Sequence, residues 1–261
     1  MREVLEAIHT HTIVHQRHAL FELLLDTSVD AEWRLAFAPS AAHYVLTFRD
    51  FCQHVLRAEP RGDRVQQLVN AQIDREVERA YWFIADLAQL GYDPVLPFND
   101  ALALIRSDET ARSRTRSYRL CRLALGATSL EKLALVHCIE ATASLTVQNV
   151  MDAAASWAES NAQTLASLGV TYDPARESEA LSEEVAALLG NIQVPAGVQR
   201  ELLRLVDRAF EYFAAFANEL LAAGGAALPA GERVGAHLSS PSRPRVITQI
   251  REMRSWIPPR P

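Results

Sequence analysis

Apolar side chains recur every three to four positions through most of the chain, the spacing that places them on one face of an α-helix. Strand-like alternation of apolar and polar residues is absent from the pattern. The predicted helices cover residues 2–25, 30–57, 62–91, 97–106, 109–125, 129–168, 174–190 and 196–223. Those at 97–106 and 129–168 are the ones expected to be interrupted. The pattern therefore predicts an all-α protein built as a single helical bundle of seven to eight helices.

Residues that start and stop helices stand at these boundaries. Pro60 and Gly62 precede the third predicted helix, and Gly91 follows it. Thr128 stands where it would cap the start of the sixth helix, and Gly169 stands at its end. Because the connections are short, consecutive helices are expected to be antiparallel neighbours.

The composition changes at residue 224. We expect a helical bundle domain at residues 1–223 and a tail at 224–261 that is rich in Gly, Ala, Ser and Pro. Residues 247–257 of the tail, ITQIREMRSWI, form an amphipathic segment with enough apolar surface to dock on the bundle or on a second subunit. A homodimer is therefore one expectation.

Charge and composition narrow the class of protein. Hydrophobic residues make up 49% of the 261 positions and charged residues 22%, which is typical of a globular protein. The net charge of −6 and the scattered basic residues argue against nucleic acid as a partner. A run of arginines between residues 106 and 122 is the exception, either a solvated face or a site for an anion.

The chain has the features of a cytoplasmic protein. Its three cysteines, an odd number without a CxxC spacing, indicate reduced thiols rather than disulfides or a zinc site. The N-terminal residues lack the apolar core of a signal peptide. No apolar run approaches the roughly 20 residues of a membrane span, so a membrane is not an expected partner.

Carboxylates on apolar helix faces are the first candidates for chemistry, because a buried carboxylate is costly unless it is paired, protonated or bound to a metal. Glu76 falls inside the apolar stripe of the third predicted helix, and Glu140 falls on the apolar face of the sixth, with His137 one turn before it. Glu177 and Glu184 flank the stripe of the seventh. The stripe of the third helix consists of Val69, Ile73, Val77, Ala80, Ile84 and Leu87.

Two kinds of site are compatible with these acids. Four carboxylates from three helices are the arrangement of carboxylate-bridged metal centres, which makes Glu76, Glu140, Glu177 and Glu184 candidate ligands of iron or manganese. Alternatively, Glu76 and Glu140, with His137 beside them, are a metal-free general acid and base. Glu177 and Glu184 have a simpler interpretation, as a first-turn acid and a solvated acid.

Histidines near the N-terminus form a second candidate site. His11, His15 and His18 are spaced so that one helix would carry them on one face, where they could bind a metal or a haem iron. The alternative is that they are surface residues or core histidines with satisfied hydrogen bonds. The chain has no phosphate-binding loop, nucleophile elbow or zinc-protease motif.

Three stretches make the chain resemble the haem-oxygenase-like superfamily over about residues 14–222: residues 18–51, NAQIDREVERAYWFIADLAQLG at 70–91, and LALVHCIEATASL at 133–145. The superfamily includes thiaminase-II-like hydrolases, cofactor-free oxidases and di-iron oxidases. In metal-dependent members the ligands are a Glu followed seven positions later by a His, a Glu on a later helix, and a His, Asp, His set.

Carried onto this chain, the resemblance implies an altered site. Glu76 and Glu140 match the two acids, but Phe83 stands where the first histidine belongs. The third set reads Glu177, Leu181 and Glu184 in place of His, Asp and His. His18 followed by Glu22 is similar to the proximal histidine pattern of haem oxygenases, but their glycine-rich distal helix is missing. Cys138 has no secure match to the thiaminase nucleophile.

The sequence thus leads to one leading hypothesis and two alternatives. The leading hypothesis is an enzyme of specialised, natural-product metabolism that acts on a small molecule in a cavity inside the bundle. Its chemistry would be oxidoreductase-like or a proton transfer or elimination, either without a metal or with an altered carboxylate metal site. The alternatives are a non-catalytic binding or scaffold protein that has lost the metal ligands, and a protein that binds haem through His15 or His18.

Overall fold

The computed structural model describes residues 1–59, 63–74, 79–92, 97–106, 108–163, 165 and 192–227. All regular structure within these residues is helical, which confirms the all-α prediction. The elements are α1 (Arg2–Gln16), α2 (Ala19–Leu25), α3 (Ala31–Arg34), α4 (Ala38–Phe51), the π-helical turn η1 (Cys52–Leu56), α5 (Arg64–Ile73), α6 (Arg79–Gln89), α7 (Phe98–Arg106), α8 (Asp108–Ala124), α9 (Ser129–Asn161) and α11 (Ala196–Ala227). The helix predicted at 174–190 and the docking segment at 247–257 lie outside the described residues.

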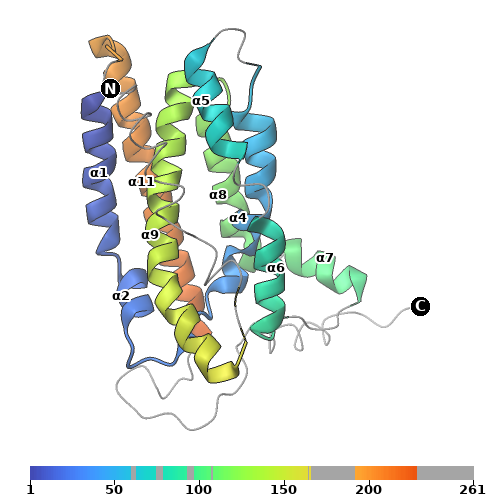
Figure 1. Ribbon diagram of the computed structural model, residues 1–261. Helices are drawn as coiled ribbons and strands as arrows, with labels where there is room; N and C mark the ends of the chain where they lie inside the picture. Colours follow the sequence, from blue (N-terminus) through green and yellow to red (C-terminus); the bar gives the residue numbers. More distant parts are fainter. Residues whose placement is uncertain are drawn as a thin grey trace.

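The two longest helices, α9 and α11, organise the bundle. They pack against each other, and α1 packs against both of them (Figure 1). On the other side α4 packs against α8, and each of these helices also contacts α11. Helix α5 lies on the first half of α9, whereas α2 and α3 also pack on α9. Helix α7 leaves the bundle at one side, next to α8 (Figure 1).

Buried apolar side chains form two core clusters along the bundle. The first core cluster is built from α1, η1, α5, α8 and the first halves of α9 and α11, and includes Leu56, Ile73, Val136, Ile139 and Phe213. The second core cluster is built from α2, α3, the start of α4, α6 and the later turns of α9 and α11, and includes Leu20, Phe37, Phe83, Val150 and Leu220. Helices α9 and α11 thus contribute to both clusters.

Two predicted helices are divided in the structure. The expected helix at 2–25 ends at Gln16, because His18 adopts an extended backbone and its ring Nδ1 accepts a hydrogen bond from the Leu20 N–H, which starts α2. The expected helix at 30–57 consists of α3, α4 and η1. Pro39 lies in the first turn of α4, where its missing N–H costs little.

Helix α9 is uninterrupted, contrary to the expected break. Its start matches the prediction: the Thr128 hydroxyl accepts from the Glu131 N–H, and the Glu131 carboxylate accepts from the Thr128 N–H at 2.7 Å. The helix ends at Asn161 rather than at residue 168, and Ala162 after it is left-handed, with φ 53°. At the other boundary, α11 continues to Ala227 instead of ending at residue 223.

The apolar stripe predicted for residues 69–87 is wrong at Ile84. Val69 and Ile73 of α5 are buried as expected, and Leu87 of α6 packs against the second core cluster. Ile84 of α6, however, is 51% exposed, and Phe83 is buried in its place. The predicted inward position of Glu76 requires a single helix over both segments, whereas α5 and α6 are separate helices. Residues 75–78, with Glu76 among them, lie outside the described residues.

None of the described helices combines the length and the apolar character that crossing a bilayer requires.

Candidate functional site

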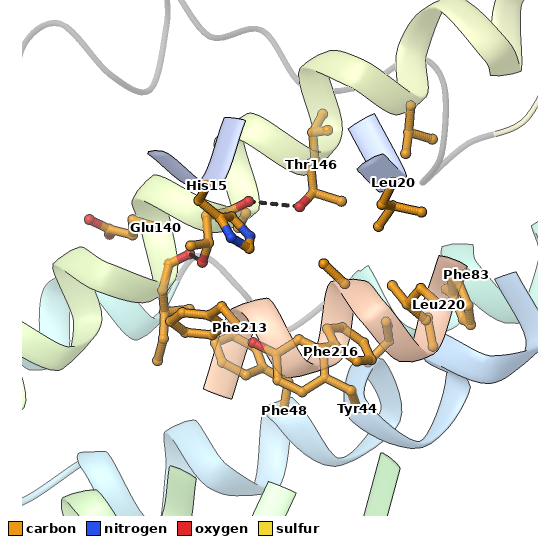
Figure 2. Close-up of a pocket in the computed structure, with 18 of the residues that line it drawn as sticks. His15, Leu20, Tyr44, Phe48, Phe83, Glu140, Thr146, Phe213, Phe216 and Leu220 are labelled. Atoms are coloured by element: carbon orange, nitrogen blue, oxygen red, sulfur yellow. Dashed lines mark hydrogen bonds between the residues drawn. The ribbon is translucent and has the colours of Figure 1, made fainter. Parts of the chain in front are cut away.

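A cavity of about 230 Å³ lies inside the bundle. Helices α4, α9 and α11 provide most of its wall, and one or two residues each of α1, α2, η1, α5 and α6 complete it. Figure 2 shows Glu140 at one end and Leu20, Phe83 and Leu220 at the other. Between the two ends, His15 and Thr146 face an aromatic wall made by Tyr44, Phe48, Phe213 and Phe216 (Figure 2).

The cavity lies where the two core clusters meet. Leu56, Val136 and Phe213 of the first core cluster line it, and so do Phe37 and Val150 of the second. Most of the wall is therefore apolar or aromatic. A binding site of this kind favours a molecule with a large apolar part and uses its few polar groups to set orientation.

Glu140 is the predicted acid that reaches this cavity. It is held from two sides: the Gln72 side-chain amide of α5 donates to Glu140 Oε2 at 3.3 Å, and His137 Nδ1 lies 3.5 Å from the same oxygen. The Glu140 side chain is 44% exposed. The prediction that Glu140 faces inward is thus confirmed for the cavity wall, but the carboxylate also keeps contact with solvent.

His137 supports Glu140 from outside the cavity. Its position one turn before Glu140 in α9 puts the imidazole beside the carboxylate, but His137 does not line the cavity. Burial lowers the pKa of His137 to about 4, so the ring is neutral at pH 7. The contact with Glu140 favours the tautomer with the proton on Nδ1. Nε2 is then a buried acceptor, and no described residue donates to it.

His15 is the histidine that lines the cavity. It lies in the last turn of α1, is 8% exposed, and packs its ring against the edges of Phe21 and Phe210. Burial, followed by the nearby His18, lowers the pKa of His15 to about 4. The cavity wall therefore carries a neutral imidazole, which can donate one hydrogen bond and accept another.

The prediction that His11, His15 and His18 share one helix face is wrong. His18 lies beyond the end of α1 and caps α2. Since its Nδ1 accepts from the Leu20 N–H, Nε2 carries the proton and donates to Asn218 Oδ1 at 3.1 Å. Both ring nitrogens of His18 therefore already have hydrogen-bond partners. His11 pairs with Asp207 at 2.9 Å and stacks on Phe210.

Four further polar side chains line the cavity: Arg49, Gln72, Thr142 and Thr146. The two threonine hydroxyls donate to backbone carbonyls one turn earlier in α9, including a 2.8 Å bond from Thr146 to Thr142, and keep their lone pairs for a ligand. Arg49 follows Tyr44, Val45 and Phe48 on the cavity face of α4. A position in helical register with apolar residues is thus the sequence signal that marks Arg49, as it is for the acids.

The remaining predicted ligands are not placed. Glu76, Glu177 and Glu184 all fall in segments outside the described residues. Within the described segments, no three His, Cys, Asp or Glu side chains are grouped closely enough to hold a metal ion. The altered carboxylate metal site thus stays a prediction.

Comparison with known proteins gives no identification. Neither a protein-family model nor a curated protein matches the chain. The resemblance to the haem-oxygenase-like superfamily accordingly stays a prediction.

Proposed function

We propose that the chain is an enzyme of small-molecule metabolism that binds a largely apolar substrate inside the bundle and moves a proton on it with Glu140. The observation that carries the proposal is a carboxylate at the end of an otherwise mostly apolar cavity. A carboxylate next to low-dielectric walls is a stronger base toward a bound substrate than it is in water.

The neighbouring groups support this role. Gln72 donates to the Glu140 carboxylate and so fixes its direction, and His137 lies on the same oxygen. His15 is neutral and faces the cavity, so its N–H is available to a substrate oxygen on which negative charge develops when a proton leaves. In the proposed step a substrate C–H or O–H bond breaks, the proton moves to Glu140, and it returns at another position.

The oxidoreductase chemistry expected from the resemblance is the variant to be separated from this proposal. The metal-dependent form of that variant needs ligands besides Glu140, for which Glu76, Glu177 and Glu184 are the candidates. The two reactions differ in the mass of their products. Proton transfer in D₂O exchanges hydrogen for deuterium, whereas oxidation removes two hydrogens or adds oxygen.

The experiment uses the full chain in D₂O with a small-molecule extract from cells, followed by mass spectrometry. We expect the wild-type protein to introduce single deuterium atoms into one or a few compounds. Glu140→Gln keeps the shape of the side chain but cannot take the proton, so its rate should fall by about 100-fold or more. Glu159→Gln, an exposed substitution later in α9, is the matched control and should behave as wild type.

Three results contradict the proposal. Products that have lost two hydrogens or gained oxygen indicate redox chemistry. Equal deuterium incorporation by Glu140→Gln removes Glu140 from the reaction. An extract left unchanged by the wild-type protein favours the second candidate, a non-catalytic binding protein. The predominance of apolar wall supports that candidate.

A further inference from the structure

We propose that the cavity binds an apolar monocarboxylate, with the ligand carboxylate paired to Arg49 and its apolar body running toward Leu20, Phe83 and Leu220. This inference rests on the proposed function only in that the ligand occupies the same cavity. It names the class of molecule, whichever reaction follows.

The cavity is long, and its two ends differ in character. On α4, eight residues separate Ala41 from Arg49, and on α9, ten residues separate Glu140 from Val150; all four line the cavity. At 1.5 Å per residue these are separations of about 12 and 15 Å. Arg49 and Glu140 directly follow Phe48 and Ile139, which both belong to or pack on the first core cluster. The end opposite Glu140, at Leu20, Phe83 and Leu220, is apolar (Figure 2).

Arg49 is a half-buried cation without a partner among the described residues. Its side chain is half-buried on the cavity wall, and no described residue accepts a hydrogen bond from it or forms an ion pair with it. A guanidinium carries its charge at every physiological pH and presents paired N–H groups that match a carboxylate. A partly buried cation without an anion is unfavourable, so a carboxylate ligand completes the site.

Other buried or half-buried arginines do not share this state. Arg34 donates to the Leu24 carbonyl at 3.0 Å, and Arg116 pairs with Glu219 at 3.1 Å. Both therefore have partners within the protein. Of these arginines, only Arg49 both lines the cavity and is left without a partner by the described residues.

The charges of the other groups at the cavity limit the charge that a ligand can carry. Glu140 repels an anion, but its Oε2 is engaged by Gln72, and the carboxylate keeps access to solvent. His15 is neutral. Among the described residues, the cavity wall therefore carries one cation, Arg49 of α4, and one anion, Glu140 of α9, which are not paired with each other. A single carboxylate can pair with Arg49, whereas a second negative charge on the ligand would meet no further cation there and would be repelled by Glu140.

The volume of the cavity limits the size of the ligand. A cavity of roughly 150 Å³ accommodates benzene. The present cavity is larger, about 230 Å³, and elongated, which suits an unbranched body of roughly eight carbons better than a fused ring system.

The experiment compares octanoate, octan-1-ol and octylamine, which share the apolar body, by isothermal titration calorimetry on the full chain. We expect octanoate to bind at least about 10-fold more tightly than octan-1-ol, because a hydrogen bond to a charged group contributes more than a neutral one. Octylamine should bind most weakly. Arg49→Gln should weaken octanoate by about 10- to 100-fold and leave octan-1-ol within about twofold.

Three variants keep the result interpretable. Arg49→Lys should restore part of the octanoate affinity, because the charge returns without the paired N–H groups. Arg122→Gln, exposed on α8, is the matched control and should bind as wild type. Ala217→Phe fills the cavity from α11 and should abolish binding of all three compounds. Circular dichroism of each variant checks that it is folded.

The outcomes separate the two proposals. If octan-1-ol binds as tightly as octanoate and Ala217→Phe abolishes both, the carboxylate inference is overturned while the cavity remains a binding site. If Ala217→Phe does not affect binding, the ligands bind elsewhere and the inference is likewise overturned. Octylamine as the tightest ligand would make Glu140, not Arg49, the dominant charge. Failure of the Glu140 exchange experiment, with octanoate binding intact, rejects the proposed catalysis alone.

Discussion

Burial determines the protonation state of two histidines, His15 on the cavity wall and His137 beside Glu140. In both cases burial is the main cause that lowers the pKa from 6.5 to about 4. The neutral rings can then form hydrogen bonds without adding positive charge, which for His15 means no second cation beside Arg49 on the cavity wall. Protonating either ring in the folded protein costs free energy that the unfolded chain does not have to supply.

Because the pKa values of these two histidines are lowered, we expect the free energy of unfolding to fall in mild acid. Because the folded-state pKa lies below the unfolded value of 6.5, the stabilisation is complete above pH 6.5 and is lost as the pH falls toward 4. For His137 alone, the free energy of unfolding should drop by about 2 kcal/mol between pH 7 and pH 5. Urea unfolding at the two pH values measures it.

A variant isolates this contribution. His137→Leu should show a drop smaller by about 2 kcal/mol, while His9→Leu, at an exposed position of α1, should lose as much stability as wild type. Equal drops in wild type and His137→Leu would contradict the assignment of a low pKa to His137.

At the scale of elements, the sequence could predict those helix boundaries that depend on residues close together in the chain. The capping box at Thr128 was predictable because both partners lie within four residues. The break at His18 was not, because histidine is not one of the usual capping residues and its ring is also bonded to Asn218, 200 positions away. The exposure of Ile84 was missed for another reason: the helical phase of α5, which ends at Ile73, was extended into α6.

Some residues of the candidate site could likewise be predicted from the sequence, and others could not. Glu140 could be placed on an inward face because α9 is regular over its whole length. His15 could be singled out only as one of three histidines, because helical spacing does not reveal that α1 ends at Gln16, between His15 and His18. Gln72 was missed because its side-chain amide is uncharged, and only charged side chains on apolar faces were candidates.

The end of α9 gives a prediction for an element. Ala162 has φ 53° and ψ 36°, a conformation that is unfavourable for a residue with a Cβ. Ala162→Gly should therefore raise the free energy of unfolding by about 0.5–1 kcal/mol, net of the greater backbone entropy of glycine in the unfolded chain. Ala158→Gly, inside the same helix, should lower it by a similar amount. Chemical denaturation compares the two, and a destabilising Ala162→Gly would contradict the left-handed cap.

For the whole molecule, a buried ion pair connects the two sides of the bundle. Arg116 of α8, with a side chain only 4% exposed, pairs with Glu219 of α11 and lies 3.8 Å from the centre of the Phe216 ring. The arginine run of the sequence is therefore not one solvated face. Burial lowers the pKa of Arg116 to about 10, with Glu219 acting in the opposite direction, so Arg116 stays charged at pH 7.

Removing this arginine should destabilise the bundle as a whole. Arg116→Ala leaves Glu219 without its partner and removes the contact that supports Phe216, so the free energy of unfolding should fall by about 2–3 kcal/mol. Arg122→Ala, exposed on the same helix, should change it by less than about 0.5 kcal/mol. Thermal unfolding of both variants provides the test, and equal melting temperatures would contradict a structural role for the pair.

The meeting of the two core clusters at the cavity bears on how cooperatively the protein unfolds. Where the clusters are separated by internal space, each can open by local unfolding without the other, and amide hydrogens in the two halves of α9 can exchange at different rates. A molecule in the cavity would contact side chains of both clusters and couple their opening. Ligand binding would then merge two folding units into one, and amide exchange would report it along the length of α9.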